Sequence, residues 1–335
     1  MKGLTSTLAG AAIALSGLAA APTAAQTQAT AINDIQQDTV KGRTWDRFVE
    51  LVEEKLGDGM DIRVSHGEAL YDQKTIVQAL QLGAVQFISP VVGVYSGTFP
   101  KLSVFVLPYL MPSPEAIRAV MDDPELGGAL LDEMRAQGIE PLAIWLNGPR
   151  DIGRTGSTPI LEPGDMQGVK IRVPPGRNYV EAFELLDANV TTMSWGEVPT
   201  ALRQGVIDAV EPVPHAWLAS SMYETAQQIT KTEYIWDFYI VATNKPWWDG
   251  LDAETRDALS AAMDEATAWN WENTNAENAA ALEEMAAAGA TIHDLTPEQR
   301  GAWAEAMRPL WDDLGRELVG DGPMDRIIEI TDEYR

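Results

Sequence analysis

The chain has 335 residues with a hydrophobic content of 45%, which is typical of a globular protein and excludes wholesale disorder. Its formal net charge of −26 disfavours nucleic acid and anionic membrane surfaces as partners, and the lack of cysteine excludes disulfides and thiol chemistry. The length suggests one large domain or two ordinary ones. An anionic ligand would need a local site built from arginines, because the mean field repels it.

The N-terminal segment has the features of a secretory signal peptide. Lys2 precedes an apolar run of small residues from Leu8 to Ala21, and Thr23-Ala24-Ala25 offers a cleavage site. A membrane anchor is the alternative, but the run is short and rich in Ala, Gly and Thr. We therefore expect residues 1–25 to be removed and the mature protein to reach the periplasm without stable membrane insertion.

Strands and helices alternate through the first half of the chain. Predicted strands cover 29–35, 61–64, 85–88, 102–107 and 142–146, and predicted helices lie around 48–56, 75–82, 115–121 and 126–136. The last of these strands leads into Asn147-Gly148-Pro149-Arg150, so an arginine follows a strand end and a Gly-Pro turn.

The stretch 165–213 carries the clearest pattern. The predicted order is a strand over 169–173, a helix around 179–186, a strand over 190–193, a helix between Gly196 and Gly205, and a strand over 206–210. Lys170 and Arg172 alternate with apolar residues in the first strand, so one face is basic. This order favours a parallel sheet with ligands at the carboxyl ends of its strands, near Arg172 and Trp195.

Residues 75–91 align without gaps on residues 197–213, which suggests an internal duplication and two similar lobes. The identical pairs are Ala79/Ala201, Leu80/Leu202, Gly83/Gly205, Pro90/Pro212 and Val91/Val213. Residues 61–64 also echo residues 170–173. Chance recurrence of Ala, Leu and Gly is the alternative.

The last third of the chain is dominated by one long helical segment. A helix to about Gln228 and a strand over 232–243 come first. Residues 253–288 then contain neither Gly nor Pro, and as a single helix they would span roughly 54 Å across both lobes. Two helices joined near 271–273 are the alternative. A helical segment over 296–319 and a charged tail end the chain.

The sequence carries no motif for metal, phosphate or dinucleotide chemistry. His66, His215 and His293 lack metal-ligand spacing, and no Gly-x-Ser-x-Gly elbow, phosphate loop or Gly-x-Gly-x-x-Gly turn occurs. We therefore expect no cofactor, no metal and no enzymatic activity. Glu197 and Glu211 flank one helix and would be the acid/base pair of an enzyme if there were one.

The arginines instead suit recognition of a carboxylate. A guanidinium can grip a carboxylate through two parallel hydrogen bonds, which lysine cannot reproduce. Arg150 and Arg172 from adjacent strand ends could overcome the repulsive mean charge within a closed cleft. A solvated surface position is the alternative for either arginine, and core packing is the alternative for Trp195.

Several segments resemble the substrate-binding proteins of TRAP transporters, of the C4-dicarboxylate-binding type. They are Gly168-Val-Lys-Ile-Arg-Val-Pro174, Trp195-Gly-Glu-Val-Pro-Thr-Ala-Leu-Arg-Gln-Gly-Val-Ile-Asp-Ala-Val-Glu-Pro212, Asn147-Gly148-Pro149-Arg150, Gln78-Ala-Leu-Gln-Leu-Gly83, Leu107-Pro108-Tyr109, Asn244-Lys245 and Trp248-Asp249-Gly250-Leu251. The resemblance covers roughly residues 38–295.

The resemblance implies an α/β, two-lobed periplasmic-binding-protein-like fold, in which each lobe has a mainly parallel central sheet and a long helix bridges both. We expect lobe I to comprise 26–147 plus 238–275, and lobe II 148–237 plus 276–335. The resemblance also implies that Arg172 forms a salt bridge with the ligand carboxylate and that Arg150 is a second donor. The receptor would deliver its organic acid to a TRAP membrane permease.

Departures from the family pattern suggest a ligand other than succinate or malate. Pro212 replaces a ligand-contacting Asn, and Trp195 replaces a Phe. A less polar or bulkier carboxylate would suit these changes, and we also expect Ser89, His215 and Trp236 to contribute to the ligand-binding site. The alternatives are an exported carboxylate-modifying enzyme on the same scaffold, or an interaction protein that has lost ligand binding.

Overall fold

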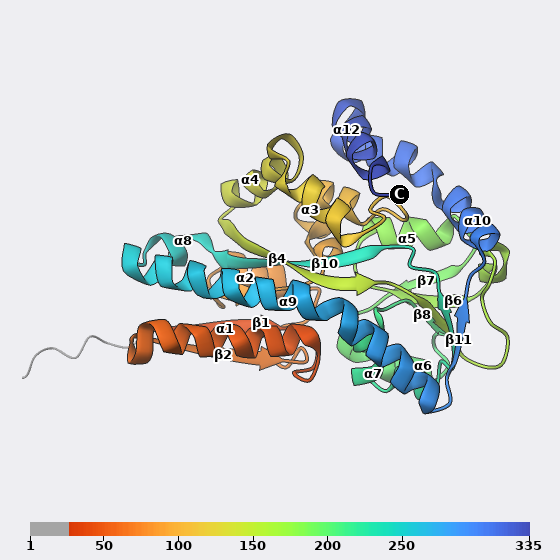
Figure 1. Cartoon of the computed structure of the whole chain (residues 1–335), viewed down its shortest axis with the longest axis horizontal. Helices are drawn as coiled ribbons and strands as arrows, with labels where there is room; N and C mark the ends of the chain where they lie inside the picture. Colours follow the sequence, from red (N-terminus) through yellow and green to blue (C-terminus); the bar gives the residue numbers. More distant parts are fainter. Residues whose placement is uncertain (1–26) are drawn as a thin grey trace, which may run out of the picture.

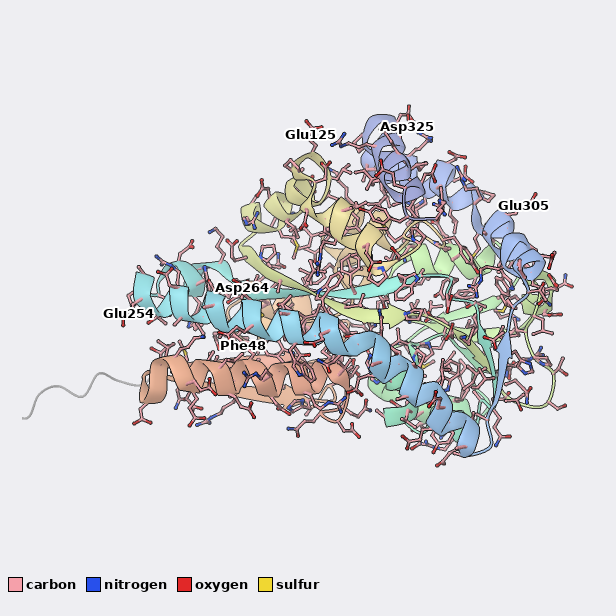
Figure 2. The ribbon with its side chains drawn as sticks, in the orientation of Figure 1. Phe48, Glu125, Glu254, Asp264, Glu305 and Asp325 are labelled. Carbon is pink, nitrogen blue, oxygen red and sulfur yellow. The ribbon has the colours of Figure 1, made fainter. Side chains whose placement is uncertain are left out.

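The computed structural model describes residues 27–335, so the expected signal peptide lies outside the described residues. Two β-sheets, each covered by helices, form two lobes, and the long helix α9 (Ala253–Ala287) passes along both (Figure 1). This arrangement confirms the predicted α/β, two-lobed fold class. Figure 2 shows how densely side chains fill the space between these elements.

The first lobe is built on a five-stranded sheet. In spatial order its strands are β2 (Met60–His66), β1 (Thr27–Asn33), β3 (Phe87–Ile88), β10 (Trp236–Asn244) and β4 (Ile139–Pro149). The first three run parallel, whereas β10 is antiparallel to both of its neighbours. Ala31, Ile32 and Phe87 have no exposed surface, as expected for strands that are covered on both faces.

The second lobe is built on a six-stranded sheet. Its spatial order is β11 (Thr291–Asp294), β9 (Gln228–Lys231), β5 (Ile152–Arg154), β8 (Ala209–Val210), β6 (Lys170–Val173) and β7 (Asn189–Thr192). Strands β7, β6 and β8 run parallel, which confirms the parallel arrangement predicted for residues 165–213. Strand β5 is antiparallel to β8 and β9.

The two sheets repeat one arrangement. The series β2, β1, β3, β10, β4 has the same directions as β7, β6, β8, β5, β9. Helix α2 (Ile76–Gln81) leads into β3 as α6 (Val198–Arg203) leads into β8, with left-handed Gly83 and Gly205 in the turns. The topology thus agrees with the predicted duplication. The echo of residues 61–64 in 170–173 does not, because β2 corresponds to β7 rather than β6.

The remaining helices cover the two sheets. They are α1 (Val40–Leu56), α3 (Pro114–Asp122), α4 (Ala129–Ala136), α5 (Arg177–Glu184), α7 (Pro214–Ala219), α8 (Lys245–Asp249), α10 (Pro297–Met307), α11 (Arg316–Val319) and α12 (Asp321–Asp332). The chain passes between the sheets after β4, after β9 and along α9. The carboxyl ends of β1 and β6 face the other lobe, because Asp34 and Arg172 at these ends line a space to which both lobes contribute.

Helix α9 is anchored at its middle by a row of buried polar side chains. Asn270 accepts from the Leu146 N–H at 2.6 Å, and Thr274 donates to the Leu146 carbonyl at 3.3 Å. Asn278 donates to the Asn147 carbonyl at 3.0 Å and accepts from the His215 N–H at 3.1 Å. One continuous helix therefore fixes β4 and α7 relative to each other, and the prediction of a single helix is confirmed.

Three predicted elements were wrong. The helix predicted to reach about Gln228 ends at Ala219, and a 3-10 turn (Met222–Glu224) and the start of β9 at Gln228 follow it. Residues 102–107 form the 3-10 turns η3 (Pro100–Val106) rather than a strand, because a fully buried apolar run lacks the periodicity that separates strand from helix. The charged tail contains α12, which buries Met324 and Ile327. Helix α12 packs against α3 of the first lobe, although we expected residues 276–335 to belong to the second.

Candidate functional site

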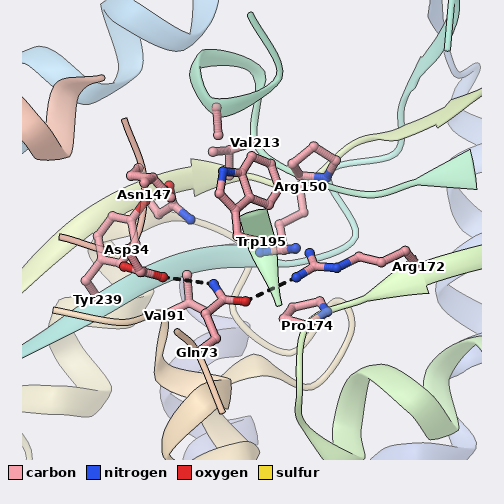
Figure 3. A pocket seen from close by; sticks show the side chains of 13 residues that line it. Asp34, Gln73, Val91, Asn147, Arg150, Arg172, Pro174, Trp195, Val213 and Tyr239 are labelled. Atoms are coloured by element: carbon pink, nitrogen blue, oxygen red, sulfur yellow. Dashed lines mark hydrogen bonds between the residues drawn. The ribbon is translucent and has the colours of Figure 1, made fainter. Parts of the chain in front are cut away.

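A cavity of about 30 Å³ lies between the two lobes (Figure 3). The first lobe contributes Asp34, Ile35, Gln73, Val91, Asn147 and Tyr239, and the second contributes Arg150, Arg172, Pro174, Trp195, Pro212, Val213 and Ala216. A space of this size holds only one or two water molecules. An organic acid can therefore enter only if the lobes separate or the lining side chains rearrange.

Arg172 lies one residue before the end of β6 and is 2% exposed. Its Nε and Nη2 donate to the Met193 carbonyl at 3.0 and 2.6 Å, and Nη2 also donates to Oε1 of Gln73 at 3.1 Å. The Met193 carbonyl fixes the orientation of the guanidinium. The Gln73 contact crosses between the lobes and lies on the cavity (Figure 3).

The guanidinium of Arg172 has neutral acceptors only. Within residues 27–335, no carboxylate lies at ion-pair distance from it, and the ring of Trp195 lies 5.6 Å from its central carbon. Burial lowers the pKa of Arg172 to about 10, so the group still carries its charge at neutral pH. A buried cation without an anionic partner is costly, and an anionic ligand would relieve that cost.

Arg150 also lines the cavity, but two carboxylates already compensate its charge. Nε and Nη2 bond to the two carboxylate oxygens of Glu211 at 2.5 and 2.8 Å, and Nη1 bonds to Asp237 at 2.5 Å. Burial opposes its charge, but the two carboxylates outweigh that effect and raise the pKa of Arg150. The predicted second donor thus sits within a buried ion-pair network.

The opposite wall carries an acidic group that the sequence reading missed. Asp34, one residue past β1, bonds to the fully buried Lys41 and accepts from Nε2 of Gln73 at 2.8 Å. Lys41 also donates to the Ser89 carbonyl at 2.9 Å and lies 4.1 Å from the centroid of the Tyr239 ring. The only available signal was position, because Asp34 lies next to the last residue of the strand predicted over 29–35.

Trp195 stands at the start of a helical turn that the first lobe holds from across the cleft. Its side chain is 5% exposed and lines the cavity. The carboxylate of Glu68, in the loop between β2 and α2, accepts from the backbone N–H of Trp195 at 3.3 Å and of Gly196 at 2.7 Å. Ser194 donates to Asp72 of the same loop at 3.1 Å. These contacts join the lobes beside the cavity.

The other predicted site residues differ in their placement. Pro212 lines the cavity directly. His215 stands behind it with Nε2 3.0 Å from Oδ1 of Asn147, and Nε2 is the donor because an amide oxygen can only accept. Burial lowers the pKa of His215 to about 3, so the ring is neutral at pH 7. Ser89 accepts from Trp45 at 2.8 Å and does not line the cavity, and neither does Trp236.

The site lacks the features of a metal centre or an acid/base pair. Nowhere in residues 27–335 do three His, Asp or Glu side chains group as metal ligands would. Glu211 is bound to Arg150 and to the Tyr234 hydroxyl, whereas Glu197 is 59% exposed and caps the turn at Ser194.

No helix in the described part of the chain is both long and apolar enough to cross a bilayer.

Residues 33–317 match the model of a family described as bacterial extracellular solute-binding proteins, family 7. The chain belongs to this family. It is 34% identical over 286 residues to the C4-dicarboxylate-binding periplasmic protein DctP of Rhodobacter capsulatus, covering 85% of each chain. It is 26% identical over 302 residues to the ectoine-binding periplasmic protein TeaA of Halomonas elongata, covering 88% of this chain and 86% of the other.

Solved structures of TRAP periplasmic solute-binding proteins share the fold. A TRAP periplasmic solute-binding protein from Shewanella oneidensis with bound succinate has a TM-score of 0.87 and 25% identity, covering 92% of this chain and 100% of that chain. One from Anaerococcus prevotii with bound glucuronate has a TM-score of 0.86 and 27% identity, covering 92% and 99%. These relatives are solute-binding proteins rather than enzymes.

Proposed function

We propose that this family 7 protein is an extracytoplasmic receptor that binds a small organic carboxylate between its lobes and delivers it to a TRAP-type membrane permease. The observation that carries the proposal is Arg172, a buried guanidinium that faces an inter-lobe cavity and has no carboxylate partner among residues 27–335. Relatives that bind succinate, glucuronate or ectoine support an organic acid as the ligand.

The geometry suggests how the carboxylate would be held. The Met193 carbonyl occupies the Nε side of the Arg172 guanidinium, and the Nη2 bond to Gln73 occupies the cavity side. A ligand carboxylate that replaced the neutral Gln73 oxygen would gain two parallel charge-assisted hydrogen bonds. Trp195 would cover the ligand from the second lobe, and the Pro212 backbone would form part of the wall.

Binding would be coupled to closure of the lobes. The cavity is narrow, and the contacts of Glu68 with Gly196 and of Asp72 with Ser194 join the lobes beside it. Rotation about the connections after β4 and β9 would break those contacts and admit the ligand. Delivery to a permease would require the lobes to open again at the membrane and release the ligand.

A thermal-shift screen over organic acids tests the receptor function. A true ligand at about 100 times its Kd adds roughly 2.7 kcal/mol to the free energy of unfolding. Recovery of the bound acid unchanged, followed by NMR, separates a receptor from a carboxylate-modifying enzyme. Absence of stabilisation by any acid would favour an interaction protein that has lost ligand binding. Uptake of the acid by a reconstituted TRAP permease only in the presence of this protein would establish delivery.

A further inference from the structure

Anionic side chains outnumber cationic ones around the cavity. The side chains that line it or bond to its lining residues include the cations Lys41, Arg150 and Arg172 and the anions Asp34, Glu68, Glu211 and Asp237. The formal charge of this set is therefore −1 before any ligand enters. A ligand with two negative charges would raise the imbalance in a place where water cannot screen it.

Among these cations, only Arg172 has no carboxylate partner in residues 27–335. Three of the five N–H groups of Arg150 bond to Glu211 and Asp237, whose two charges more than balance its own. The Lys41 ammonium bonds to Asp34 and to the Ser89 carbonyl and lies over the face of the Tyr239 ring. A second ligand carboxylate would thus be buried without a cationic partner, which costs far more than burying a neutral polar group that is hydrogen-bonded.

The wall opposite Arg172 offers acceptors. The Asp34 carboxylate faces the cavity with one bond to Lys41 and one to Gln73, and a carboxylate has about four acceptor positions, so two are left. Oδ1 of Asn147 already accepts from the Tyr239 hydroxyl at 2.6 Å and from His215. On the second lobe Pro212 has no N–H to donate. A hydrogen-bond donor at the distal end of the ligand would therefore find a charged acceptor in Asp34.

We infer that this receptor selects a monocarboxylate whose distal end carries hydrogen-bond donors, either hydroxyl groups or a protonated nitrogen, and discriminates against C4-dicarboxylates. Arg172 holds the carboxylate, and Asp34 accepts from the distal donors. This inference rests on the proposed receptor function and names its ligand class. It differs from the ligand in the name of the R. capsulatus relative, which is a C4-dicarboxylate.

A pair of ligands of equal shape gives the sharpest test. Succinate and its monoamide, succinamate, differ only in whether the distal group is a carboxylate or an amide donor. Calorimetry on the wild-type protein at pH 7 should give succinamate at least about a tenfold lower Kd than succinate. Glucuronate and ectoine, added as further arms, distinguish hydroxyl donors from a protonated nitrogen, and the tighter of the two identifies the distal chemistry.

The Asp34→Asn variant tests the role of the acidic wall. It removes one acceptor charge and frees Lys41 to meet a second carboxylate, so the preference for succinamate over succinate should shrink several-fold or reverse. Asp58→Asn, which changes an exposed aspartate, is the matched control and should leave the preference unchanged. If Asp34→Asn does not fold, the wild-type comparison alone decides.

The outcomes separate the two levels of the account. Succinate binding as tightly as succinamate, or more tightly, overturns the ligand class while the receptor function stands. Binding of succinamate, glucuronate or ectoine with weak succinate binding supports both. Failure of every acid in the panel to bind overturns the ligand class together with the proposed function.

Discussion

Replacing Arg150 by methionine should destabilise the folded protein severely. Methionine keeps most of the side-chain length but removes the cation that compensates Glu211 and Asp237, both with fully buried side chains. Removing one partner of a buried ion pair typically costs about 3–5 kcal/mol, and here two carboxylates lose their partner. We therefore expect the free energy of unfolding at pH 7 to fall by at least about 3 kcal/mol.

Urea unfolding followed by tryptophan fluorescence measures this loss. Arg203→Ala is the matched control, because Arg203 is exposed and its side chain bonds to Thr200 alone in the described part of the chain. It should change the free energy of unfolding by less than about 0.5 kcal/mol. Adding Glu211→Gln to Arg150→Met should cost less than the sum of the two single changes. A variant that keeps wild-type stability but loses ligand affinity would refute this reasoning and place Arg150 on the ligand instead.

Three further predictions concern selectivity, closure and pH. Trp195→Ala should raise the Kd for bulky acids by about tenfold and for small acids by less, since Trp195 forms part of the cavity wall. Calorimetry that showed an equal rise in Kd across a ligand panel would mean that Trp195 does not determine selectivity. Glu68→Gln should raise the ligand Kd about threefold to tenfold, because it weakens the acceptor for Gly196 N–H, and an unchanged Kd would argue against a role in closure. Burial raises the pKa of Asp151 to about 8, so the stability that its protonated form contributes is complete below the unfolded pKa and is lost as pH rises toward 8. Asp151→Asn, which stays neutral, should therefore add about 1 kcal/mol or more to the free energy of unfolding at pH 8 and less at pH 5. Urea titrations at the two pH values would show this difference.

The parts of the fold that the sequence predicted were those with strong local periodicity. The alternation around Arg172 and the unbroken segment that became α9 follow from local chemistry, whereas the predicted Gly-Pro turn before Arg150 was wrong, because β4 continues through Pro149. The 3-10 turns at 100–106 were missed because a buried apolar run reads alike as strand or helix. Helix α12 was missed because charged residues dominate its sequence and only a few apolar residues, among them Met324 and Ile327, mark its buried face.

The site was predictable only in part, because its second wall is made by long-range contacts. Arg172 could be placed at a strand end, but nothing local shows that Gln73 reaches it from the other lobe. Arg150 pairs with Glu211, which is 61 positions away in the sequence, and with Asp237, which is 87 positions away. Sequence spacing alone cannot reveal that two carboxylates already pair with this arginine.

The most direct test of the account is the affinity of Arg172→Ala for the acid that stabilises the wild-type protein most. Calorimetry should show a loss of at least about a hundredfold, since truncating one partner of a buried charge pair costs roughly 3 kcal/mol or more, while Arg203→Ala binds like wild type. Equal affinity in Arg172→Ala and wild type would contradict the claim that this guanidinium holds the ligand carboxylate between the lobes.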